Sequence, residues 1–330
     1  MSNYRFLYEA AKGSDVPAEM VGTSGYLSHP SSSLDPNLFD GDHLKSEVQS
    51  HVLNVLNRWF TTKGFKSIDS WLHAWIAGSS ISYQWAADRG NGDIDVLFGI
   101  DMGPFIRSNQ EYSELGEPNL AAMITDSLKA EVWPGESNVR FGDRVYEVTY
   151  YFNSRTGKDI ASALHPYAAY DLVSDMWTVR PPSLPENPGA LYPQRWFDQA
   201  RGDTERAAEL KKHYDEASHD LNAAVMNTPG WHNAGARLNL VTSQAHALWY
   251  DLHEGRKSAF SEQGKGYQDW NNFRWQRAKA SGAVEVLHAI TEVGTAAREA
   301  EETQLYGQPI EASDVILRRA MLHHRGGWTQ

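Results

Sequence analysis

Two short stretches decide the interpretation of this sequence: residues 76–80 read Ile-Ala-Gly-Ser-Ser, and residues 93–96 read Asp-Ile-Asp-Val. The first stretch ends an apolar run over 71–77, which is typical of a buried strand that breaks at a glycine. The second stretch opens another apolar run over 93–100, which predicts a second strand. A short helix over 81–87 is predicted between them, so the expected order is strand, Gly-Ser turn, helix, strand.

The two aspartates of the second strand carry the chemistry. Because alternate residues of a strand point to the same face, Asp93 and Asp95 are expected to project side by side. Neighbouring carboxylates repel each other unless a cation lies between them. Magnesium prefers hard oxygen ligands from one or two carboxylates together with substrate phosphates. The pair therefore predicts a Mg²⁺ site, with Mn²⁺ as the alternative ion; a polar strand end is the simpler interpretation, although aspartate is depleted in strands.

The Gly-Ser turn is the second candidate feature. Gly78 permits close approach of a ligand to the backbone, and Ser79 and Ser80 add hydroxyl donors. Backbone N–H groups exposed where a strand turns into a helix form a ready anion site. These three residues are therefore predicted to hold a phosphate group. Serines also cap helices well, and this structural role is compatible with the phosphate role.

Together these residues resemble the signature of the DNA polymerase beta-type nucleotidyltransferase superfamily. That signature is a hydrophobic residue followed by Gly-Ser or Gly-Gly, a connecting segment, and then Asp-hydrophobic-Asp-hydrophobic. The resemblance covers residues 43–185 and identifies no subfamily, although phage-encoded members are one group that the chain resembles. It implies an α+β fold with a small mixed sheet, two magnesium ions on Asp93 and Asp95, triphosphate binding at the turn, and a helical domain that follows.

The family also implies a third carboxylate on a later strand, and two residues qualify. Glu147 lies in a strongly strand-like run over 145–152, where it shares a face with Thr149. Asp171 lies in a further strand-like run over 168–173 and matches the family's acid-hydrophobic-hydrophobic pattern. Glu147 is preferred as catalytic residue and metal ligand, because a later segment resembles the one that closes the family's domain and the third acid normally precedes it by some distance.

The remaining sequence predicts three regions. Residues 1–42 are rich in Ser, Pro, Gly and Asp and are expected to form an N-terminal arm. Residues 43–185 are the predicted catalytic domain, which begins with a helix over 43–63 capped by Asp42. Residues 186–330 follow a Pro-rich stretch and are expected to form an α-helical C-terminal domain. Further helices are predicted over 117–130, 195–225, 234–253, 269–280, 283–298 and 313–323.

Composition narrows the possible functions. The formal net charge of −12 argues against a non-specific nucleic-acid coat, since the phosphate backbone would repel the chain. The sequence has no cysteine, which excludes disulfides, thiolate metal sites and a thiol nucleophile. The polar N-terminus predicts no secretory signal, and no apolar run is long enough to span a bilayer, so a cytoplasmic protein without membrane contact is expected.

The resemblance implies transfer of a nucleoside monophosphate from an NTP, ATP among them, to an acceptor hydroxyl with release of pyrophosphate. The acceptor remains open between an RNA or tRNA 3′ end, a second nucleotide, a small molecule and a protein side chain. The alternatives are a cyclic or linear nucleotide second-messenger synthase, a catalytically silent nucleotide-binding protein of the same fold, and a metal-dependent phosphohydrolase. Basic and aromatic residues interleave over 256–277, either as contacts to an acceptor or as cover for a helical core.

Overall fold

The chain forms two units and has an α+β fold, with the strands in one unit and the longest helices in the other. The computed structural model describes residues 4–22, 24–85, 92–153 and 159–309. Within these, one unit contains the sheet and comprises residues 27–190 and 260–267 (the sheet unit). The other comprises residues 4–26, 191–259 and 268–309 and consists of helices (the helical unit).

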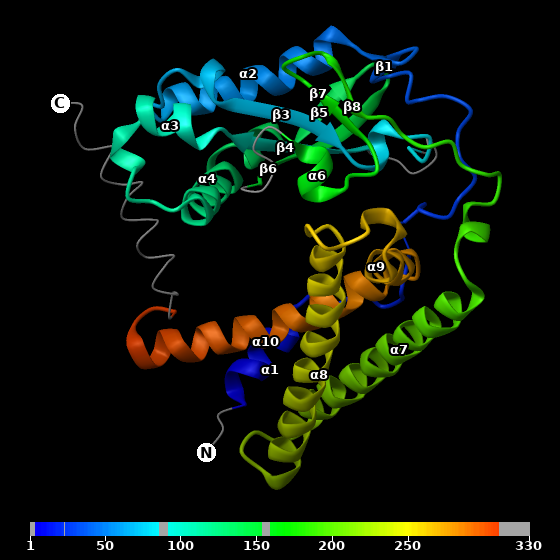
Figure 1. The fold of residues 1–330 in the computed structure, drawn as a ribbon. Coiled ribbons are helices and arrows are strands. Elements are labelled where there is room, and N and C mark those ends of the chain that lie inside the picture. The colour runs from blue at the N-terminus through cyan, green and yellow to red at the C-terminus, as the bar shows by residue number, and fades with distance from the viewer. Residues whose placement is uncertain (1–3, 23, 86–91, 154–158, 310–330) are drawn as a thin grey trace. The chain divides into compact units, whose positions relative to one another are not determined.

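The sheet unit is built on a six-stranded mixed sheet with the order β5-β6-β4-β3-β7-β8 (Figure 1). β4 and β6 run parallel, and the other neighbouring pairs are antiparallel. The strands predicted over 71–77, 93–100 and 145–152 are confirmed as β3, β4 and β6. The strands are β3 Leu72–Ala77, β4 Gly92–Ile100, β5 Asn138–Phe141, β6 Arg144–Phe152, β7 Ala169–Asp171 and β8 Met176–Val179, with a separate hairpin of β1 Phe39–Asp40 and β2 His43–Leu44.

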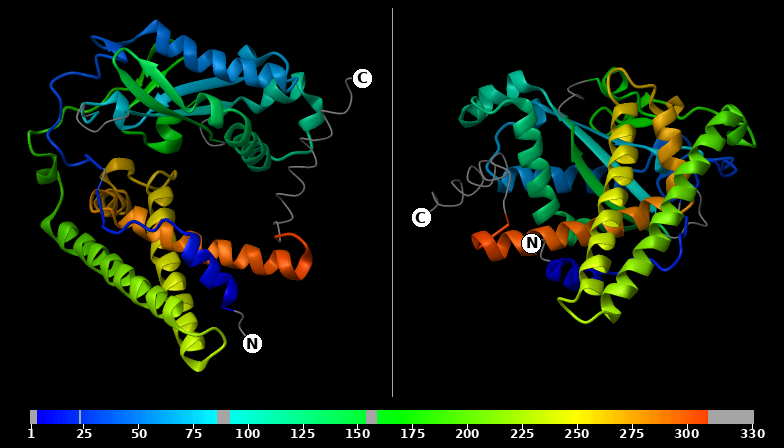
Figure 2. Two further views of the ribbon diagram at one scale, coloured as in Figure 1. Left: turned by 180° about the vertical axis from the view of Figure 1, so that it is seen from behind. Right: turned by 90° about the horizontal axis from the view of Figure 1, so that it is seen from below.

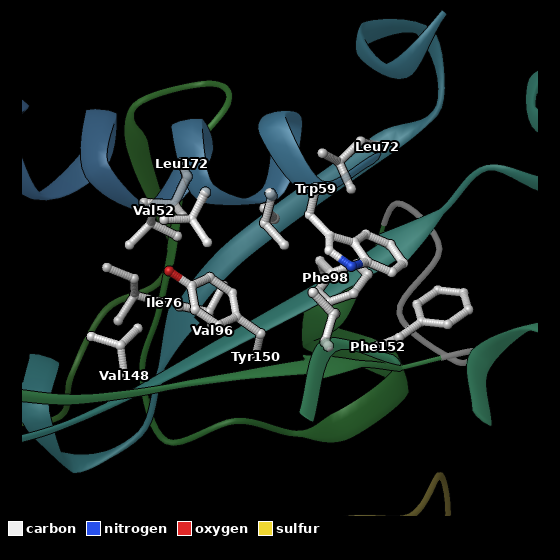
Figure 3. Packing of buried hydrophobic residues seen from close by; sticks show 14 of the residues in the cluster. Val52, Trp59, Leu72, Ile76, Val96, Phe98, Val148, Tyr150, Phe152 and Leu172 are labelled. Atoms are coloured by element: carbon white, nitrogen blue, oxygen red, sulfur yellow. The ribbon is translucent and has the colours of Figure 1, made fainter. Parts of the chain in front are cut away.

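One face of the sheet carries the main hydrophobic core. The side chains of Ile94 and Val96 on β4 and Val148 on β6 are fully buried there. The helix α2, Ser46–Thr62, packs its apolar stripe over them, and Figure 3 shows Val52 between helix and strands. Because the core-facing residues of β4 occupy every second position, the intervening residues must face the other way.

The opposite face is only partly covered within the sheet unit. A short helix, α6 Ile160–Leu164, packs against Trp75 and Ala169 in a small second cluster. Leu97 of β4 is partly buried against the same cluster. The polar residues Asp93 and Asp95 precede Leu97 on this face. The other helices of the unit are α3 Met102–Ser108, α4 Glu117–Glu131 and α5 Trp133–Glu136.

Alanine and leucine side chains fill the core of the helical unit. The small alanines let the long helices approach closely. α7 and α8 lie side by side, with α10 packed against both and α1 against α10 (Figure 2). Ala207, Ala234 and Ala245 are buried in the core that these helices share. The helices are α1 Arg5–Gly13, α7 Gln194–Ala223, α8 Pro229–Ala259, α9 Trp270–Ala280 and α10 Ala283–Tyr306.

Two local predictions about the N-terminal region are wrong. The expected arm contains α1, whose Leu7 is buried in the core of the helical unit. Asp42 does not cap α2, because Lys45 occupies that position and Asp42 pairs with Arg180 at 2.7 Å. Leu44 is buried in the β1–β2 hairpin, so the helix starts later than expected.

The segment between β3 and β4 also differs from its prediction. The helix expected over 81–87 is replaced by a 3₁₀ turn at Ser79–Ile81, and residues 86–91 lie outside the described residues. The helix predicted over 313–323 lies outside them as well. Across the described ranges, no helix is both long and apolar enough to traverse a lipid bilayer.

Candidate active site

Asp93 and Asp95 lie on the face of β4 that is turned away from the main core. Ile94 and Val96, which alternate with them, are fully buried on the other face. Asp93 is exposed and Asp95 is half-buried. The regular alternation of the strand therefore brings both carboxylates to one side of the sheet, where solvent or a ligand can reach them.

β6 places two more polar side chains next to this pair. It runs parallel to β4, with Glu147 beside Asp93 and Thr149 beside Asp95. Glu147 is exposed on the same face, and Thr149 is half-buried. The hydroxyl Oγ1 of Thr149 donates a hydrogen bond to Oδ1 of Asp95 at 3.1 Å. Three acidic side chains and one hydroxyl thus occupy adjacent positions on two neighbouring strands.

The Gly-Ser turn approaches the pair from the other side. β3 pairs with β4 so that Ala77 lies beside Asp95, and Gly78 follows at once. Gly78 has φ +97° and ψ −161°, a conformation that residues with a side chain rarely adopt. A Cβ atom at this position would lie 3.2 Å from Oδ2 of Asp95. Glycine is therefore favoured both by the backbone and by the closeness of the carboxylate.

The two serines of the turn are placed differently. Ser79 is exposed, whereas Ser80 is buried, and its Oγ has no hydrogen-bond partner among the described residues. A buried hydroxyl without a partner carries a desolvation cost of about 1–3 kcal/mol. The 3₁₀ turn is too short to act as a helix terminus, so any anion binding here comes from its hydroxyl and N–H groups rather than from a helix dipole.

The structure does not bring Asp171 to this site. It pairs with Trp75 on β3, so β3 separates it from β4. Its Oδ1 accepts hydrogen bonds from the backbone N–H groups of Val173 at 2.8 Å and Ser174 at 2.9 Å. Asp171 therefore stabilises the turn between β7 and β8, while Glu147 lies directly beside Asp93.

The carboxylates of Asp93 and Asp95 are the oxygen ligands that magnesium prefers, but they do not form a complete binding site by themselves. Within the part of the chain that the structure describes, no three His, Asp or Glu side chains gather closely enough to hold a metal ion. Asp93 and Asp95 nevertheless offer two carboxylates on one face, and magnesium is commonly bound by only one or two, with water and substrate phosphates as the other ligands. The pair thus fits a site that substrate completes.

A network on the core face supports the strand end that carries Asp93. The Tyr146 ring packs against Gly92, where a Cβ atom would lie 2.2 Å from the ring carbon Cδ1. The Tyr146 hydroxyl donates to the buried carboxylate of Asp35 at 2.6 Å. Burial and the hydrogen bond to Asp35 raise the pKa of Tyr146, so the phenol stays protonated and keeps donating. No local sequence pattern predicts this contact, because 111 residues separate the partners.

The basic and aromatic residues over 256–277 include several with packing roles. Arg274 on α9 binds Asp203 with Nε at 2.6 Å and Asp251 with Nη1 at 2.7 Å. Arg256 lies over the Trp275 ring, 5.3 Å from its centroid. These contacts lie inside the helical unit, and they match the interpretation in which arginine stems cover a helical core.

Comparison of the chain with protein-family models, with curated proteins and with solved structures finds no match. The inference about function therefore starts from the site itself. Its decisive features are two carboxylates on one strand face, a third acid in register, and a glycine turn in close contact with Asp95.

Proposed function

We propose that this protein is a nucleotidyltransferase that moves a nucleoside monophosphate from an NTP to an acceptor hydroxyl and releases pyrophosphate. The sheet unit would then be a domain of the polymerase beta type. The observation that carries the proposal is the position of Asp95, which shares a face with Asp93 while its Oδ2 faces the Gly78 turn. A phosphate at that turn would lie within reach of a cation held by the two aspartates.

Asp93 and Asp95 would hold magnesium, and Glu147 is the next carboxylate in register. When bound, the ion supplies Lewis-acid stabilisation of the charge that develops on the phosphates and on the departing pyrophosphate. No Lys, Arg or His side chain of the described residues lies within ion-pair distance of Asp95, so its charge is not already neutralised by them. This supports a role in cation binding over a purely structural one.

The protein's own groups have separate tasks in this reaction. Ser79 and Ser80, with the backbone of the turn, would bind the phosphates, and the buried Ser80 Oγ would gain a hydrogen-bond partner. Glu147 would accept the proton of the acceptor hydroxyl as that oxygen attacks the α-phosphate and the bond to the pyrophosphate oxygen breaks. The exposed position of Glu147 leaves it accessible to the acceptor.

The central experiment replaces Asp95 by alanine and measures pyrophosphate release with magnesium and each of the four NTPs. Products are identified by mass spectrometry, first without an added acceptor and then with RNA. Since metal stabilisation is worth several kcal/mol, we expect D95A to lose activity by roughly 10³-fold. A product formed without added acceptor would identify a nucleotide as the acceptor.

The matched control is Asp143→Ala, which removes an exposed aspartate from the turn between β5 and β6 of the same unit. It should retain full activity, and both variants should melt close to the temperature of the native protein. Wild-type activity in D95A would overturn the proposal. Magnesium-dependent NTP binding without turnover would identify a silent nucleotide-binding protein, and release of orthophosphate would identify a phosphohydrolase.

A further inference from the structure

We infer that Thr149 is a positioning residue, which fixes the Asp95 carboxylate so that one oxygen is held by the protein and the other faces the Gly78 turn. This inference rests on the proposed function, and it adds a residue that the motif does not contain. The Thr149 hydroxyl lies 3.1 Å from Oδ1 of Asp95. Oδ2 of the same carboxylate lies on the side of the turn, 3.2 Å from where a Cβ atom of residue 78 would be.

The two oxygens of Asp95 thus have different surroundings. An aspartate side chain on a strand can rotate about χ1 and χ2, and the χ2 preference is broad. A hydrogen bond from the neighbouring strand removes part of that freedom, because Thr149 lies directly beside Asp95 in the parallel register. The carboxylate is consequently oriented before a cation or nucleotide arrives, and this lowers the entropic cost of binding.

A threonine hydroxyl is suited to this task. It donates one hydrogen bond but carries no charge, so it forms no ion pair that would compete with a cation for the carboxylate. An arginine or lysine at the same position would neutralise Asp95 and compete with the metal. The branched Cβ of threonine also restricts χ1, which keeps the hydroxyl directed across to β4. The half-buried position of Thr149 partly shields the bond from water.

The test uses Thr149→Val, which preserves the shape of the side chain and removes the hydroxyl, and Thr149→Ser, which retains it. Binding of Mn²⁺ alone is measured by electron paramagnetic resonance without nucleotide, and the magnesium concentration for half-maximal turnover is measured separately. Residues that orient metal ligands typically affect affinity 10–100-fold, so we expect T149V to weaken Mn²⁺ binding by roughly 10-fold or more. T149S should stay within about 3-fold of the native protein.

Thr178→Val is the matched control, because it also removes a threonine hydroxyl from the same sheet. That hydroxyl accepts a hydrogen bond from Trp75 Nε1 at 3.1 Å. Thr178 lies on β8, at the edge of the sheet and away from β4, so T178V should leave Mn²⁺ affinity unchanged. If T149V proves unstable, Thr149→Ala repeats the measurement at a temperature where its near-ultraviolet circular dichroism is native.

The outcomes separate this inference from the proposed function. Native protein that neither binds Mn²⁺ more tightly than D95A nor turns over NTP overturns both. Native protein that does bind and turn over, together with T149V of equal Mn²⁺ affinity, overturns only the role of Thr149. Weaker binding by T149V and T149A, with recovery in T149S, supports the inference.

Discussion

The aspartates that bind Arg274 in the helical unit and Asp95 in the sheet unit lie in contrasting surroundings. In the helical unit, Asp203 and Asp251 share the guanidinium of Arg274, which binds Asp203 through two nitrogens at 2.6 and 2.9 Å. In the sheet unit, Asp95 accepts its hydrogen bond from the neutral hydroxyl of Thr149. Asp203 and Asp251 thus pair with a cation of their own unit, whereas the hydrogen-bond donor to Asp95 is uncharged.

The difference separates structural acids from acids that can bind a ligand. The bidentate geometry of Arg274 satisfies both oxygens of Asp203, and these hydrogen bonds raise the pKa of the arginine, which stays charged at every accessible pH. No further cation is needed there. Among the residues that the structure describes, no arginine forms an ion pair with Asp95, so a divalent ion would have more to stabilise on β4.

Replacing an acidic side chain of the sheet unit by its amide should have the largest effect on nucleotidyl transfer. Glu147→Gln should lower nucleotidyl transfer by roughly 10²–10³-fold, since Glu147 lies beside Asp93 and would serve as metal ligand and proton acceptor. Asp171→Asn should leave transfer unchanged, because an amide oxygen can still accept from Val173 and Ser174. Both rates are measured as pyrophosphate release at saturating magnesium.

The reverse result has a clear meaning. If D171N abolished transfer while E147Q did not, the third carboxylate would be Asp171 and the register argument would be wrong. If neither variant mattered, the reaction would use Asp93 and Asp95 alone.

Much of the sheet and part of the site could be predicted from sequence, because both depend on local alternation. The apolar runs over 93–100 and 145–152 identified β4 and β6, and period-two spacing placed the acids on one face. The parallel pairing of these strands could not be predicted in the same way. It depends on contacts between residues more than 50 positions apart, such as Asp95 and Thr149.

Two elements were predicted wrongly from the sequence, α1 and the segment that follows the Gly-Ser turn. The α1 helix lies in a stretch rich in polar residues, and its Leu7 is buried through packing of α1 against α10, α7 and α8. Ser82 and Gln84 form a turn instead of the expected helix, since the Ser82 hydroxyl accepts from the Gln84 backbone N–H at 3.1 Å. Serine side chains offer the backbone such alternatives to helical bonding.

In the helical unit, removing the cation that pairs with Asp203 should lower the stability of the fold and leave nucleotidyl transfer unchanged. Arg274→Met should reduce the free energy of unfolding by about 3 kcal/mol, because it leaves the largely buried Asp203 without its charge partner. Adding Asp203→Asn should recover part of that loss, and urea denaturation of the single and double variants measures both. Transfer activity per folded molecule should be unchanged. Unchanged stability with lost transfer to RNA would instead assign Arg274 to acceptor binding.

A smaller effect on stability is expected from His253 in the helical unit, because the charge of its imidazole depends on pH. Burial lowers the pKa of the His253 imidazole, and the charge of Lys257 lowers it further. Unfolded histidine has a pKa of about 6.5, so below that pH the unfolded chain binds more protons and stability falls as pH decreases. His253→Phe, which can keep the stacking on Trp249, should flatten the decline in melting temperature between about pH 7 and 5.

His246→Phe provides the control for that last measurement. It lies on the same helix and stacks on Tyr250 but is exposed, so it shows what replacing a stacked histidine by phenylalanine does without a change in burial. Equal slopes for the native protein and H253F would show that His253 titrates alike in the folded and unfolded chain. The expected difference is a few degrees at most, since the imidazole is only partly buried and water screens its charge. If the melting temperature of H253F alone depends less on pH, burial of His253 sets its pKa, whereas the surroundings of Asp203 are set by its ion pair with Arg274.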